Sequence, residues 1–228
     1  MFCALESPSR FGYTIAEPKM NKKLRLYGDR TGLERILFFS DAVMAIAITL
    51  LVIDLRVPEM ARGLAAAKLG PALLELWPNY LGYLLSFFII GHYWLSHHRL
   101  FRPIRRYDDR LAWLNLLFLF FTALLPFSTR LIGLYPGNRT AILVYSLNIL
   151  PLGISSYVMT QHAYACDRLI DAAFDSAEIR LHLGFTRRVA AIFMVCLVVP
   201  VIFPVSFFPV WFLGFLGRGI SRRIWKTP

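Results

Sequence analysis

Two polar side chains lie inside the first long apolar stretch of this 228-residue chain, where they could carry chemistry. Arg35 directly precedes the stretch. Ser40 and Asp41 lie inside it, between one and two helical turns after Arg35. A carboxylate inside a membrane helix is costly unless it faces protein or water, so such residues often serve a function. Asp41 could carry a transported proton or hold helices together, and both interpretations remain open.

Arg35 and Asp41 are expected to find their partners on neighbouring helices. They are six residues apart, nearly two turns, so a contact within one helix would be strained. The ends of the next two apolar stretches carry candidate partners at the same depth: Trp94, His97, His98 and Asn115. On the alternative interpretation, Arg35 only anchors its helix at the membrane edge and Asp41 only packs helices.

An apolar stripe follows Asp41 in the same stretch. Ile46, Leu50 and Ile53 recur at i, i+4 and i+7, which places them on one face of a helix with Thr49 beside them. Taken alone, this periodicity favours an ordinary surface that faces lipid or protein.

Other patterns with chemical meaning are weak. His97 and His98 are adjacent and diverge on a helix, and His92 lies five residues before His97, so a shared haem or enzyme site is disfavoured. The three cysteines are scattered without CxxC spacing, and no glycine-rich phosphate loop is present. The sequence therefore predicts no enzyme and no cofactor.

The elements that must position these residues are membrane helices. Hydrophobic residues make up 57% of the chain and charged residues 17%, against about 25% charged in a soluble domain. The apolar residues gather in blocks fenced by arginines, at 36–55, 79–97, 111–127, 141–164 and 190–216. This pattern predicts an all-α polytopic membrane protein.

Charge determines the expected topology. If the N-terminus is cytosolic and 190–216 forms two short spans, 20 Lys and Arg residues lie inside and 5 outside, against 16 and 9 for a single terminal span. We therefore predict a cytosolic tail over 1–31, a six-helix transmembrane domain over 32–217 and a basic cytosolic tail over 218–228. The net charge of +11 sits at the ends of the apolar blocks, where it suits anionic lipid headgroups and not a nucleic acid.

The first span carries a resemblance to a known family. Arg35, Phe39, Ser40 and Asp41 form an Arg-x-x-x-Phe-Ser-Asp pattern, which resembles the signature of the transmembrane protein 175 family of endolysosomal potassium channels and their bacterial relatives. Further similar segments are Ala45-Ile46 with Thr49, Ser86-Phe87, Tyr93-Trp94, His97-His98, Asn115 and Leu125-Pro126-Phe127. The resemblance covers about residues 32–216.

This resemblance implies a potassium-permeable, moderately selective cation leak channel, and the sequence contains no TVGYG-like carbonyl filter. It implies that the first helix lines a central pore, with Ile46 at the narrowest apolar constriction, Leu50 and Ile53 as further rings and Thr49 supplying hydroxyls. One six-span repeat per chain implies a homotetramer of the bacterial inner membrane with both termini cytosolic. Its expected partners are its own copies and membrane lipids, with potassium as the permeating ion.

The resemblance also assigns a structural network behind the pore wall. Arg35 and Asp41 are expected to hold the first helix against the second and third through Trp94, His98 and Asn115. The chain departs from many bacterial relatives in carrying alanine, not glycine, directly after Asp41. The alternative function is a proton- or cation-coupled secondary transporter that uses Asp41, although inverted repeats and a broken helix pair at midplane are not evident.

Overall fold

The computed structural model describes residues 30–165, 169–171, 198–200, 202–203 and 207–209. Its helices are α1 (Arg30–Ile53), α2 (Arg62–Glu75), α3 (Trp77–Phe101), α4 (Asp109–Leu134) and α5 (Arg139–Ala165). Within these residues the only strand-like pairing is one antiparallel bridge between Ile104 and Ile170. The expected all-α class is confirmed for this part of the chain.

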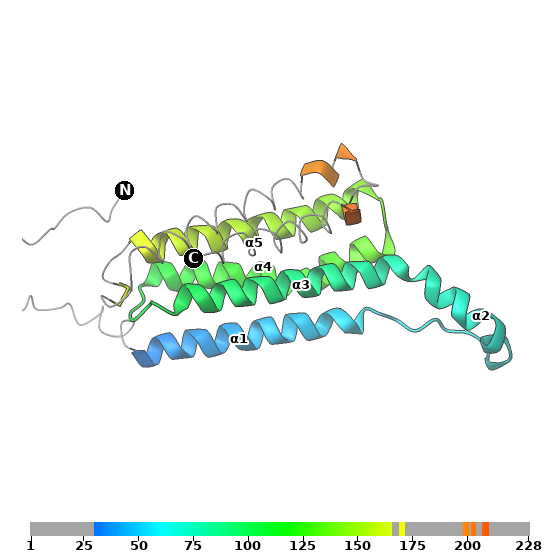
Figure 1. Cartoon of the computed structure of the whole chain (residues 1–228), viewed down its shortest axis with the longest axis horizontal. Coiled ribbons are helices and arrows are strands. Elements are labelled where there is room, and N and C mark those ends of the chain that lie inside the picture. The colour runs from blue at the N-terminus through cyan, green and yellow to red at the C-terminus, as the bar shows by residue number, and fades with distance from the viewer. Residues whose placement is uncertain (1–29, 166–168, 172–197, 201, 204–206, 210–228) are drawn as a thin grey trace, which may run out of the picture.

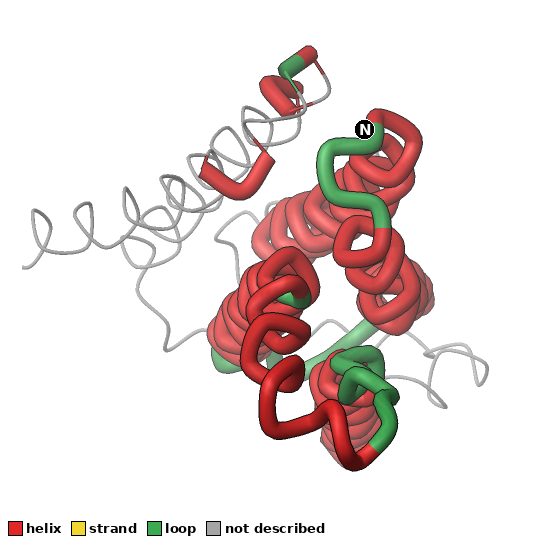
Figure 2. Tube along the Cα trace, turned by 90° about the vertical axis from the view of Figure 1, so that its right-hand side faces the viewer, coloured by secondary structure: helices red, strands yellow, loops and turns green. Residues whose placement is uncertain are grey.

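The four long helices lie side by side and alternate in direction, while α2 projects beyond one end of them (Figure 1). Helix α4 packs against α1, α3 and α5, and α1 packs against α3 and α4. Figure 2 shows the bundle from the end at which α2 projects. Helices α1 and α5 therefore lie on opposite sides of the bundle. One face of α1 is held by α3 and α4, and the other is left uncovered by these helices.

The predicted spans 36–55, 79–97, 111–127 and 141–164 correspond to α1, α3, α4 and α5. Helices α1, α4 and α5 are each long and apolar enough to cross a membrane, and α3 meets the same standard together with α2, to which it is bent by 48°. The described residues thus hold three candidate membrane spans, or four if the bent pair α2–α3 is one span, in agreement with the expected polytopic membrane protein. The fifth and sixth predicted spans, at 190–216, lie mostly outside them, although Phe207 is buried against Tyr145.

Helix α2 is an element that the sequence analysis did not predict. It contains Arg62 and Lys68, so it is too polar to stand out as an apolar block, yet its run of three alanines favours a helix. Pro71 lies inside α2, whereas Pro78 lies in the first turn of α3, where its missing N–H costs nothing. None of the α2 side chains is buried, so α2 adds little to the core.

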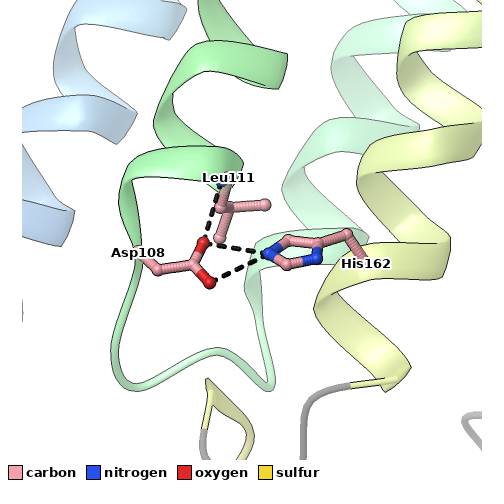
Figure 3. Close-up of polar contacts among 3 residues, drawn as sticks. All are labelled: Asp108, Leu111 and His162. Carbon is pink, nitrogen blue, oxygen red and sulfur yellow. Dashed lines mark hydrogen bonds and ion pairs between the residues drawn. The ribbon is translucent and has the colours of Figure 1, made fainter. Parts of the chain in front are cut away.

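One end of the bundle is fastened by a polar contact between α4 and α5 (Figure 3). Asp108 caps α4 by accepting a hydrogen bond of 2.9 Å from the Leu111 backbone N–H. Its two carboxylate oxygens lie 2.9 and 3.0 Å from Nε2 of His162, in the last turn of α5. The start of α4 and the end of α5 are therefore fixed to each other at this end.

A buried polar cluster joins α3, α4 and α5 inside the bundle. Ser86 Oγ lies 2.6 Å from Thr129 Oγ1 and 3.0 Å from the Tyr145 hydroxyl. Asn148 Nδ2 donates to Ser128 Oγ at 3.0 Å. Interhelical hydrogen bonds of this kind hold membrane helices together, because lipid supplies no competing partners. They also fix the register of the three helices, since each bond fails if one helix slides.

Gly133 of α4 marks a close approach to the start of α3. A Cβ atom at this position would lie 2.8 Å from Nδ2 and 3.2 Å from Cα of Asn79. Small residues let membrane helices pack at such short range. Gly91 of α3, by contrast, has open space where its Cβ would be.

We therefore expect Gly133→Ala to destabilise the protein by roughly 1–3 kcal/mol, the usual cost of overpacking. Gly91→Ala is the matched control and is expected to be neutral or slightly stabilising, because alanine favours a helix more than glycine does. The midpoint of thermal unfolding in detergent micelles measures both. Equal midpoints for the two variants would contradict the close packing of α3 and α4.

Candidate functional site

Helix α1 has a buried face that contacts the bundle. Met44, Ala47 and Leu51 are buried at i, i+3 and i+7, against α3 and α4. This spacing is that of one helical face. The apolar side chains on it fix how α1 is rotated about its own axis.

The residues predicted to line the pore lie on the opposite face of α1. Ile46, Thr49 and Ile53 each follow one of the buried residues by two positions, which turns them by about 200° around the helix. Ile46 is 58% exposed in the single chain, Leu50 41% and Ile53 68%, and Thr49 is exposed as well. The structure thus brings these four side chains together on one uncovered stripe.

Thr49 uses its hydroxyl hydrogen within α1. Its Oγ1 lies 3.0 Å from the Ala45 carbonyl oxygen and 2.9 Å from that of Ile46, so the hydroxyl donates to the turn before it. A hydroxyl that donates one hydrogen keeps two lone pairs. The side chain can therefore present an oxygen acceptor on the uncovered face, next to the apolar stripe.

A buried hydrogen-bonded chain connects α1, α4 and α3 behind that stripe. Asn115 Nδ2 donates to Ser40 Oγ at 2.9 Å, and Ser40 Oγ donates to the Ile36 carbonyl at 2.7 Å. Asn115 Oδ1 lies 2.8 Å from His97 Nε2. Because the Asn115 amide nitrogen is already a donor to Ser40, its oxygen accepts from the imidazole. Ser40, His97 and Asn115 are all buried, so each satisfies another in the apolar interior.

Asp41 has a partner on α3, as the sequence analysis expected. Trp94 Nε1 donates to Asp41 Oδ1 at 2.9 Å. The Trp94 indole stacks on the His98 imidazole, with ring centroids 6.0 Å apart. Asp41 and Trp94 are both exposed in the single chain, in contrast to the buried chain through Asn115. The structure therefore places His98 in the Asp41 layer and gives the buried contact with Asn115 to His97.

Arg35 and Phe39 of the signature are exposed on α1. Among the described residues no ion pair to Arg35 is found, so its side chain does not reach Asp41. An ion pair that the sequence analysis missed occurs at the other end of α1, where Arg130 of α4 lies 3.4 Å from Asp54. The signal was available, since both residues were expected near the outer ends of their spans. The described part of the chain holds no group of three or more metal-ligating side chains.

Comparisons with known proteins show what this chain is similar to. The family model "Endosomal/lysosomal potassium channel TMEM175" matches residues 35–126. A potassium channel of Chamaesiphon minutus is 36% identical over 180 residues, which cover 78% of this chain and 85% of that protein. A potassium channel of a Chryseobacterium species is 30% identical over 163 residues, which cover 71% of this chain and 78% of that protein.

A solved structure is also similar. It is the crystal structure of a lysosomal potassium-selective channel TMEM175 homolog from Chamaesiphon minutus, with a TM-score of 0.69 and 31% sequence identity. The match covers 82% of this chain and 96% of that one. The endosomal/lysosomal proton channel TMEM175 of Danio rerio is 26% identical over 144 residues, 63% of this chain but 27% of that protein.

The Asn115 chain can be tested by an isosteric replacement. Asn115→Leu removes the bonds to Ser40 and His97 and leaves a buried imidazole without its acceptor, so we expect a loss of about 1–2 kcal/mol. Thr122→Val is the matched control on the same helix, because among the described residues the Thr122 hydroxyl bonds only to the carbonyl of Phe118 in its own helix. Thermal unfolding in micelles measures both. If the two variants lost the same stability, the interhelical role of Asn115 would be refuted.

Proposed function

Since this chain belongs to the TMEM175 family, we propose that it forms a potassium-permeable, moderately selective cation leak channel. The bacterial relatives that it matches over most of their length are named potassium channels. The animal relatives are named proton channels, but this chain covers less than a third of their length. Potassium is therefore the favoured ion. A secondary transporter that uses Asp41 is not favoured, because the relatives and the similar structure are channels.

The observation that carries the pore is the uncovered stripe of α1. Ile46, Leu50 and Ile53 point away from α3 and α4 in the single chain. One chain cannot enclose a central path with a single helix, so symmetric copies must supply the other walls. In a homotetramer, four copies of α1 would stack Ile46 and Leu50 into rings about 6 Å apart and Leu50 and Ile53 about 4.5 Å apart.

Asp41 supports assembly by an independent route. It lies about 9 Å along α1 from Arg35, at a depth where an exposed carboxylate facing lipid would be costly. Its second oxygen needs water or protein in addition to the Trp94 N–H that reaches Oδ1. A subunit contact or a water-filled entrance would supply either one, and both arise when copies of α1 gather around an axis.

The rings would control ion passage through hydration. Apolar rings gate by dewetting: a narrow ring excludes a hydrated ion, and a modest widening admits it. An aliphatic ring such as that of Ile46 offers no substitute for the water that the ion loses, so selection should be moderate. Potassium sheds water more readily than sodium and passes preferentially. The outward lone pairs of Thr49 would return part of the lost hydration near the constriction.

The polar chain behind α1 would keep the rings in place. A dewetting gate depends on small differences in radius, so the helix that carries it must not rotate or slide. Ser40 and Asp41 hold α1 against α4 and α3 through Asn115 and Trp94. These residues are positioning residues, and none of them needs to touch the ion.

The setting of the channel is also part of the proposal. The distribution of Lys and Arg along the sequence supports six helices per chain and cytosolic termini. The similarity to bacterial potassium channels supports a bacterial inner membrane. Four copies of the chain and the surrounding lipids are the proposed partners, without a nucleic acid. The pore requires no cofactor and no catalytic residue, because ions move down their own gradient.

The most direct functional experiment is potassium flux from liposomes that contain the purified protein. Ile46→Asn replaces the narrowest apolar ring with amides that hydrate, so we expect flux to rise and the preference for potassium over sodium to fall. Ile154→Asn is the matched control, because Ile154 is an equally exposed isoleucine on α5 (51%). Flux should also rise linearly with potassium concentration.

Two results would count against the channel. Ile154→Asn is expected to keep the ion preference of the wild type. If Ile46→Asn also kept it, the constriction would lie elsewhere. Saturation at low potassium concentration with slow turnover would favour the transporter.

Two substitutions at Thr49 test whether its hydroxyl contributes to ion selection. Thr49→Val removes the hydroxyl and should lower the potassium-to-sodium permeability ratio about two- to tenfold, equivalent to about 0.4–1.4 kcal/mol. Thr49→Ser keeps the hydroxyl and should retain the ratio. Bilayer recordings under bi-ionic conditions measure it, and an unchanged ratio in Thr49→Val would remove the hydroxyl from selection.

A further inference from the structure

A hollow of about 240 Å³ lies between the first turns of α1 and the last turn of α3. Its floor and wall are apolar, made by Leu33 and Leu37 of α1, Phe101 of α3 and Ile104 of the following connection. Leu33, Phe101 and Ile104 are almost fully buried. These helix ends lie at the same end of the bundle (Figure 1), which is the end that the basic residues place at the cytosolic membrane surface.

Cationic side chains surround the mouth of this hollow. They are Arg30, Arg102 and Arg105. His98 also lines the hollow, and Glu34 is the one acid among its lining residues. Arg30 and Glu34 form a pair of 3.4 Å that is largely exposed, so it holds Arg30 only weakly. Arg105 binds Asp171 firmly, with Nη2 and Nε at 2.7 and 2.8 Å from Oδ2.

Arg102 is the cation that this arrangement leaves unbalanced. Its side chain is exposed and forms no ion pair or hydrogen bond with any residue that the structure describes. The two nearby acids, Glu34 and Asp171, are each paired with another arginine. A guanidinium beside further cations is a preferred partner for phosphate, to which it can donate two parallel hydrogen bonds.

The volume and the apolar lining of the hollow limit the class of ligand that it could bind. The hollow is smaller than the roughly 300–1,000 Å³ of sites that enclose drug-sized molecules, so it suits a headgroup better than a nucleotide. A hydrated inorganic phosphate would gain nothing from Leu37 or Phe101, whereas the glycerol and first acyl carbons of a lipid would bury apolar surface there. Basic pockets between membrane helices bind anionic headgroups in this way.

We propose that this hollow is a specific site for the phosphate headgroup of an anionic phospholipid, with Arg102 as its principal ligand. Arg30 contributes further positive charge at the mouth, the His98 imidazole can add a hydrogen bond, and Leu37 and Phe101 contact the glycerol end. The proposal goes beyond the proposed function and does not require the channel to conduct. It concerns one lipid held in one place, in addition to the general attraction between basic helix ends and the membrane.

The position of the site gives binding a structural consequence. Leu37 lies one turn before Asp41 on α1, and His98 stacks on Trp94, which donates to Asp41. A headgroup between α1 and α3 would therefore brace the two helices directly beside the Asp41 layer. Bound lipid is expected to stabilise the folded protein, because a ligand that binds only the native state shifts the unfolding equilibrium.

The test uses the full chain purified in a non-ionic detergent, with thermal unfolding measured as phosphatidylglycerol or phosphatidylcholine is titrated into the micelles. Phosphatidylglycerol should raise the midpoint more than phosphatidylcholine does. Arg102→Gln should weaken the apparent affinity for phosphatidylglycerol about tenfold or more, since it removes the charge-assisted contact with the phosphate. Arg106→Gln is the matched control: it removes the same charge from the same connection, outside the hollow.

A second arm distinguishes the source of the phosphate. Inorganic phosphate is titrated in place of lipid, and it should leave the midpoint unchanged. An equal rise with inorganic phosphate, abolished by Arg102→Gln, would overturn the lipid assignment. So would equal losses of affinity in Arg102→Gln and Arg106→Gln, or the absence of any effect of phosphatidylglycerol. Should Arg102→Gln fail to fold, Arg102→Lys retains the charge and is expected to weaken binding by a smaller factor.

Discussion

The hydrogen bonds of Asn115 are the interaction on which the rest of this structure depends. In a membrane, a polar side chain without a partner is costly, and water is not present to replace a lost one. Asn115 satisfies Ser40 of α1 with its nitrogen and His97 of α3 with its oxygen, so three helices meet at one buried amide. Rotation or sliding of any of them would leave polar atoms unpaired, and this fixes which face of α1 remains uncovered.

The same hydrogen bonds divide α1 into a face that packs against the bundle and a face that remains uncovered. The face of α1 held by α3 and α4 carries Met44, Ala47 and Leu51, and the face left uncovered carries the apolar stripe with Thr49. A pore that gates by dewetting needs such a division, because its rings act through radius and must be supported from behind. The hollow with Arg102 lies at the same end as the Asp41 layer, so lipid can reinforce that support from the membrane surface.

Four of the six helices that sequence patterns predicted are α1, α3, α4 and α5, and Trp94 was among the predicted partners of Asp41. These predictions were possible because length, hydropathy and depth are one-dimensional properties that fix which residues share a level. The same patterns did not predict α2, whose alanines favour a helix but whose Arg62 and Lys68 interrupt the apolar signal. They named His97 and His98 as candidate partners and placed only His98 in the network behind the pore wall, whereas His97 makes the buried contact with Asn115. Adjacent residues on a helix point about 100° apart, and only packing decides which of them faces inward. The sequence placed Arg130 and Asp54 near the outer ends of their spans, but it did not show that these two helices are neighbours, so the ion pair was missed.

The uncovered face of α1 is proposed to line the path that ions take through the membrane. Cysteine substitution measures this directly, in a chain whose three native cysteines are replaced by serine and which is reconstituted for potassium flux. A small, positively charged thiol reagent should reduce flux through Ile46→Cys and Ile53→Cys, and leave Ala47→Cys and Leu51→Cys unaffected. Protection of positions 46 and 53 from the reagent, or modification there without loss of flux, would contradict the account.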